Sequence, residues 1–171
     1  YLDGRAFDSK EPPIMSTEGN EQYIVYNKAG HTLYAMSEII GVDRFNRALG
    51  KFIDRYRYKH DPYPNIGQFI STLREETPED LQYLITDTFE KITLYENKAK
   101  SAKAIENSDG TYNLHLEVEA KKVYSDSLGV QTTATLNDWL EIGVIAEKII
   151  DGNKQEIPIY VQKVFITDSL S

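Results

Sequence analysis

The stretch DGTYNLHLEVE, residues 109–119, identifies antiparallel β-structure in this chain. Apolar and polar residues alternate from Tyr112 to Val118, and a period of two predicts a strand with one buried face. Asp109-Gly110 directly before that strand is a hairpin signal. We therefore expect a partner strand over residues 94–105, joined to this one by a tight turn.

Two further strands are predicted downstream, over residues 140–148 and 156–167, with the turn Asp151-Gly152-Asn153 between them. Pro158 lies inside the last run, which predicts an edge strand or a β-bulge there. Short strands separated by turns are typical of an antiparallel sandwich. Residues 94–171 are therefore predicted to form a small β-sandwich domain.

Residues 1–93 have helical periodicity after a polar, turn-rich lead-in over residues 1–22. Helices are expected from Thr32 to a stop at Gly41 and over residues 43–58, the latter with an inward apolar stripe that includes Ile53. A third helix is expected after an Asn65 cap and a fourth after a Thr77 cap. The expected fold class is α+β, with about four helices followed by the sandwich.

Composition excludes several functional classes. The net charge of −8 over 171 residues argues against a nucleic-acid partner and against an anionic membrane surface. The absence of cysteine excludes disulfides, thiolate catalysis and thiolate zinc sites. Because the chain begins at Tyr1 without a methionine, we expect it to be part of a longer polypeptide.

Chemical motifs are sparse. Neither His31, His60 nor His115 begins an H-E-x-x-H pair, and no P-loop, glycine-rich dinucleotide turn or G-x-S-x-G is present. His31 is predicted to make a local hydrogen bond, and Lys28 to be solvated or to cap a helix. The residue types alone do not indicate catalysis.

The run YIVYNKAGHTLYAMSEIIGVDRFNRAL, residues 23–49, resembles a segment of the gluzincin zinc aminopeptidases, the family of aminopeptidase N and leukotriene hydrolase. In that family a Tyr-x-Lys-Gly-like step opens a helix, and Tyr26–Gly30 is similar to it except that Ala29 stands at the usual glycine position. The segment 41–45 resembles the start of the next family helix, and the likeness continues to residue 171. The register is most similar to bacterial members fused to ABC-type transporter permeases.

The resemblance implies that residues 1–93 are the helical end of a thermolysin-like catalytic domain. It implies that Tyr26 is a catalytic residue that donates its phenolic hydrogen bond to the oxyanion as zinc-activated water attacks a peptide carbonyl. Tyr23 is a candidate for the substrate-pocket wall, with packing in the core as the alternative. The zinc ligands and the general-base glutamate of the family would lie before Tyr1, so no metal ligand is assigned in this chain.

The function expected from the resemblance is that of a C-terminal fragment of a zinc metallo-aminopeptidase, which removes N-terminal residues from peptides. The fragment is expected to be inactive alone, to need the N-terminal remainder of its own polypeptide, and to bind zinc and peptide substrate only in the full-length parent. The alternative is a non-catalytic interaction or structural module of a transporter-associated protein. The chain itself is expected to be soluble, with membrane association only through segments outside it.

Overall fold

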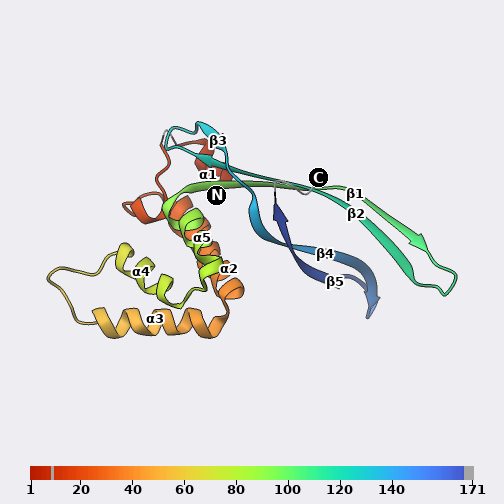
Figure 1. The fold of residues 1–171 in the computed structure, drawn as a ribbon, viewed down its shortest axis with the longest axis horizontal. Coiled ribbons are helices and arrows are strands. Elements are labelled where there is room, and N and C mark those ends of the chain that lie inside the picture. Colours follow the sequence, from red (N-terminus) through yellow and green to blue (C-terminus); the bar gives the residue numbers. More distant parts are fainter. Residues whose placement is uncertain (9, 168–171) are drawn as a thin grey trace. The chain divides into compact units, whose positions relative to one another are not determined.

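The computed structural model describes residues 1–8 and 10–167, and within them the fold is mixed α+β, as the sequence predicts. Figure 1 shows helices in the first half of the chain and strands in the second. The helices are α1 (Leu2–Ala6), α2 (Gly30–Ile40), α3 (Val42–Tyr56), α4 (Ile66–Glu76) and α5 (Gln82–Ile85). The strands are β1 (Ile92–Glu106), β2 (Tyr112–Ser125), β3 (Gln131–Thr133), β4 (Asn137–Ile150) and β5 (Asn153–Thr167).

The chain divides into two compact units. The first, the helical unit, contains Tyr1–Leu94 and also Val123–Thr132, which returns to it from the strand region. The second, the strand unit, contains Tyr95–Lys122 and the residues from Thr133 onward.

The predicted stop at Gly41 between α2 and α3 is confirmed, but the predicted start at Thr32 is wrong, because α2 continues without a break from a π-helical segment at Tyr23–Ala29. Gly41 separates the two helices with φ +93° and ψ 135°, a backbone conformation that glycine adopts most readily. Asn65 caps α4, because its side chain accepts from the Gln68 backbone while the Gln68 side chain accepts from the Asn65 backbone. Figure 1 shows α3 and α4 side by side, joined by the loop between them.

The core of the helical unit is formed by apolar side chains from most of its elements. Met36 and Ile40 come from α2, and Ile70 and Leu73 come from α4. Ile14 is also in this core, although it lies in the segment predicted to be an irregular lead-in. That prediction is wrong in part, since α1 and a 3₁₀ turn at Ile14–Ser16 both form there.

Two other local predictions are wrong. Thr77 does not cap a new helix; its hydroxyl donates to the Leu73 carbonyl at 2.8 Å and so ends α4. The following segment is divided into a 3₁₀ turn at Glu79–Leu81, α5 and a π-helical segment at Thr86–Glu90. Ile53, predicted to face inward on α3, is 55% exposed.

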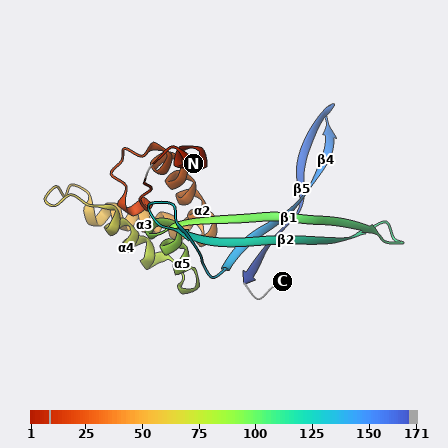
Figure 2. The same ribbon diagram turned by 90° about the horizontal axis from the view of Figure 1, so that it is seen from above.

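The strands form two sheets, with order β1-β2-β3 in one and β4-β5 in the other. Figure 2 shows β1 and β2 as one long hairpin and β4 with β5 as another. In the second hairpin Val144 pairs with Tyr160 and Ile145 with Pro158, which leaves Ile159 without a partner residue across the ladder. The bulge predicted at Pro158 is therefore confirmed.

A buried ion pair holds the strand unit where β2 ends and β4 begins. Lys122 Nζ lies 3.1 Å from Asp138 Oδ2, and both side chains are 4% exposed. Tyr95 donates to the same carboxylate at 3.2 Å. Within the described residues, every helix is too short or too polar to cross a membrane.

Candidate functional site

Tyr26, the predicted catalytic tyrosine, lies on a π-helical segment at Tyr23–Ala29 that continues directly into α2. Its side chain is 72% exposed. Among the described residues its hydroxyl has no hydrogen-bond partner. Single π-helical turns occur frequently at functional sites, and this one presents a free phenol to solvent.

Tyr23 has a different environment, although it lies only three residues earlier. Its hydroxyl donates to Asp8 Oδ2 at 3.0 Å, and its ring stacks on Tyr1 with centroids 6.0 Å apart. Burial and the hydrogen bond to Asp8 both raise the Tyr23 pKa above its usual value. The hydroxyl and the ring of Tyr23 therefore both contact other described residues. Its role as a pocket wall stays a prediction.

Lys28 anchors the same segment from its other end. Its ammonium lies 3.1 Å from Glu11 Oε1 and 3.2 Å from the Tyr1 hydroxyl. The side chain is only 11% exposed, so the prediction of a solvated or capping lysine is wrong. Burial lowers the Lys28 pKa, and the Glu11 carboxylate only partly offsets this effect.

Glu11 is the centre of this network, with a side chain 4% exposed. It accepts hydrogen bonds from the Tyr1 hydroxyl, from Arg5 Nε and from Lys28. Burial would raise its pKa, but the hydrogen bonds and the charge of Lys28 outweigh burial and hold the pKa below its usual value. The Glu11 backbone N–H also donates to the Ser127 carbonyl at 2.9 Å, which ties it to the returning segment of the unit.

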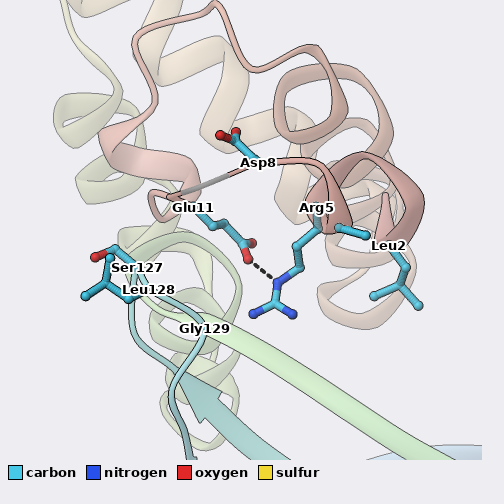
Figure 3. A pocket seen from close by; sticks show the side chains of 8 residues that line it. Leu2, Arg5, Asp8, Glu11, Ser127, Leu128 and Gly129 are labelled. Carbon is cyan, nitrogen blue, oxygen red and sulfur yellow. Dashed lines mark hydrogen bonds and ion pairs between the residues drawn. The ribbon is translucent and has the colours of Figure 1, made fainter.

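A pocket of about 240 Å³ opens beside this network. Figure 3 shows Arg5 and Glu11 joined in it, with the loop Ser127–Gly129 on the opposite side. Arg5 Nη2 donates to Ser125 Oγ at 2.9 Å, so two of its three nitrogens are held. The pocket is lined by Leu2, Arg5, Ala6, Asp8, Glu11, Ser127, Leu128 and Gly129.

Sequence reasoning missed Arg5 and Glu11, because they fall in the segment predicted to be irregular. The partners of Glu11 are up to 116 residues away in sequence, at Ser127. No local periodicity signals such contacts. The one available signal is the apolar pair Ile14-Met15 in a largely polar segment, which indicates that the segment is anchored to the core.

His31 Nδ1 lies 2.6 Å from the Asn27 carbonyl, which confirms its predicted local hydrogen bond. His115 is exposed on β2. Among residues 1–8 and 10–167, no three histidine or acidic side chains gather as metal ligands would.

Comparison with known proteins identified no family model, no curated protein and no solved structure that matches this chain.

Proposed function

We propose that this chain is the C-terminal part of a zinc metallo-aminopeptidase, and that Tyr26 stabilises the oxyanion formed when a peptide carbonyl is attacked. The observation that carries the proposal is the state of Tyr26: exposed, without a hydrogen-bond partner among the described residues, and on a segment anchored by Tyr23 and Lys28. A donor that is fixed before the reaction need not reorganise when charge develops.

The anchoring matters because it limits the motion of the backbone that carries Tyr26. Tyr23 precedes Tyr26 by three residues and bonds to Asp8, while Lys28 follows by two and pairs with the buried Glu11. A preorganised oxyanion donor contributes about 3–4 kcal/mol to transition-state stabilisation. The same phenol on a freely moving segment would lose part of that contribution to ordering.

The zinc ion that the resemblance implies does not fit the residues described. No three potential metal ligands gather among the residues that the structure describes. The proposal therefore places the zinc ligands, the general base and the remainder of the peptide site in the N-terminal part of the parent. In this proposal Tyr26 is the only active-site residue that this chain contributes.

The finer architecture is part of the same proposal. Residues 1–93 would be the helical end of a thermolysin-like domain, and residues 94–171 a β-sandwich. Tyr112, Leu114 and Leu116, on the face of β2 that the sequence predicts to be buried, are instead each at least 40% exposed. A second sheet packed on that side would remove them from water.

The test compares the parent protein with its Tyr26→Phe variant on an aminoacyl-p-nitroanilide substrate. Loss of one oxyanion donor lowers kcat by about 10²–10³-fold while KM changes little. Tyr34→Phe is the matched control, because Tyr34 is 68% exposed and lies on the adjoining α2. Full activity in Tyr26→Phe would contradict the assigned role, and the absence of an H-E-x-x-H upstream of Tyr1 would contradict the enzyme itself.

The alternative is a non-catalytic interaction module of a transporter-associated protein. Exposed apolar side chains on the β4-β5 hairpin favour this alternative, among them Ile145 at 61%, Ile149 at 75% and Val161 at 58%. Where exposed apolar side chains form a contiguous surface, that surface is typical of a binding face. A parent without zinc ligands that still binds a membrane-transporter subunit would support this module over the enzyme.

A further inference from the structure

The pocket beside Glu11 combines a small volume with an unbalanced charge. Two cations, Arg5 and Lys28, are paired with the single carboxylate of Glu11, and these side chains are 20%, 11% and 4% exposed. Asp8 also lines the pocket, but Figure 3 shows its carboxylate directed away from the Arg5 guanidinium. That carboxylate instead accepts from the Tyr23 hydroxyl. Arg5, Lys28 and Glu11 together therefore carry one excess positive charge, and the Asp8 carboxylate keeps its negative charge on the side of the pocket away from the guanidinium.

Arg5 presents that charge to the pocket. Its Nε is held by Glu11 and its Nη2 by Ser125, which fixes the plane of the guanidinium. Its Nη1 has no hydrogen-bond partner among the described residues, and neither has the Ser127 hydroxyl. A guanidinium held on two sides is preorganised to donate from the third. Arg5 Nη1 can only donate and the Ser127 hydroxyl can donate or accept, so a ligand acceptor can be bound by both.

Apolar side chains complete the pocket. Leu2 is 65% exposed and Leu128 is 66% exposed, and Figure 3 shows them on either side of the Arg5 guanidinium. An apolar ligand group placed against Leu128 or Leu2 would remove that side chain from water, and each buried methylene contributes to affinity. The volume of about 240 Å³ lies just below the roughly 300–1,000 Å³ typical of ligand sites. The space suits a ligand about the size of one residue.

We propose that this pocket binds a monocarboxylate attached to a branched apolar side chain, as at the C-terminal residue of a peptide. The one guanidinium that lines the pocket, with Nη1 unpaired among the described residues, can donate to a monoanion. A phosphate dianion would bring more negative charge beside the buried Glu11 carboxylate and would be repelled by it. The planar donor edge of arginine also suits carboxylate oxygens.

The test is an NMR titration of the ¹⁵N-labelled 171-residue chain with N-acetyl-L-leucine. Its matched control ligand is N-acetyl-L-leucinamide, which has the same side chain and no negative charge. We expect saturable shifts in the amides of Arg5, Ala6 and residues 126–130, with a dissociation constant on the order of millimolar for a ligand of about a dozen non-hydrogen atoms. The amide should bind at least tenfold more weakly.

Three variants separate the contributions. Arg5→Met should abolish the shifts, whereas Arg57→Met, which removes an arginine 60% exposed on another surface, should leave them unchanged. Because Arg5→Met removes a partner of the buried Glu11 and so destabilises the fold, Leu128→Ala provides a second test at an exposed position. Leu128→Ala should weaken binding several-fold without altering the chemical shifts of the free protein beyond its neighbours.

Four results would overturn the proposal: no saturable shift in the wild-type chain, equal binding of the leucinamide, unchanged binding in a folded Arg5→Met, or unchanged binding in Leu128→Ala. Inorganic phosphate is titrated in parallel. Tighter binding of phosphate than of N-acetyl-L-leucine would show that the pocket is a phosphate site and would also overturn the proposal. None of these outcomes depends on peptidase activity, so the pocket and the proposed function of Tyr26 fail or succeed separately.

Discussion

The ion pair between Lys28 and Glu11 should be a main support of the segment that carries Tyr26, and Lys28→Met tests this. Methionine keeps most of the aliphatic length of lysine and removes the ammonium. Glu11 is 4% exposed and would lose one of its two cationic partners while remaining buried. Water cannot replace the lost partner at such a position, so the cost appears directly in the stability of the helical unit.

The stability lost in Lys28→Met depends on the hydrogen-bond partners that Glu11 keeps. Removing one member of a buried pair costs about 3–5 kcal/mol when the other is left uncompensated. Arg5 and Tyr1 still donate to Glu11 in the variant, which places the expected loss lower, at about 2–3 kcal/mol. That value includes the contact of the Lys28 ammonium with the Tyr1 ring, 4.8 Å from its centroid.

The assay is urea unfolding followed by circular dichroism at 222 nm, which reports the helices. With a slope of about 2 kcal/mol per molar urea, the midpoint should fall by about 1–1.5 M. Lys51→Met is the matched control, because Lys51 pairs with Glu75 and Glu76 at a position 41% exposed, and its midpoint should hardly change. Equal midpoints for the two variants would refute the argument, and Lys28→Arg should recover part of the loss.

The remaining predictions concern acid stability and helix ends. The pKa of Glu11 is lower in the folded protein than its unfolded value of 4.5, so the ionised carboxylate stabilises the fold at pH values above 4.5. This stabilisation is lost as the pH falls through the folded pKa. Glu11→Gln should therefore flatten the loss of circular dichroism signal at 222 nm between about pH 5 and pH 2. Asn65→Ala, which removes the cap of α4, should lower the free energy of unfolding by about 1 kcal/mol in urea titration. Gly41→Ala should lower the free energy of unfolding, measured by calorimetry, by about 1–3 kcal/mol, because alanine is strained at the Gly41 φ of +93°. Steric contact does not contribute, since an added Cβ meets no atom within 4 Å. Gly50→Ala, inside α3 with equally open space, should instead stabilise by about 0.5–1 kcal/mol.

Local chemistry explains which parts of the fold the sequence predicted. The Asn65 cap and the Gly41 stop depend on residues within a few positions of each other, and both are present. The bulge at Pro158 follows from the missing backbone N–H of proline. Thr77 was misassigned because a threonine hydroxyl can cap a new helix or bond back to the preceding one, and sequence does not distinguish these two local bonds.

The buried network could not be predicted, because its partners are distant in the chain. Arg5 contacts Ser125 across 120 residues, and the Glu11 backbone contacts Ser127. Each of these residues has an ordinary polar neighbourhood in sequence. Only the fold brings them together, and only their burial gives the charges an energetic role.

The two tyrosines of the π-helical segment differ for a reason that helical periodicity hides. In an α-helix, residues three apart lie on the same face, so Tyr23 and Tyr26 would share one environment. The i→i+5 bonding of a π-helix widens the turn and changes the directions of successive side chains. Tyr23 can then bond to Asp8 while Tyr26 stays 72% exposed. The backbone irregularity is thus what frees one phenol while fastening its neighbour, and the Lys28–Glu11 pair stabilises the segment in which it occurs.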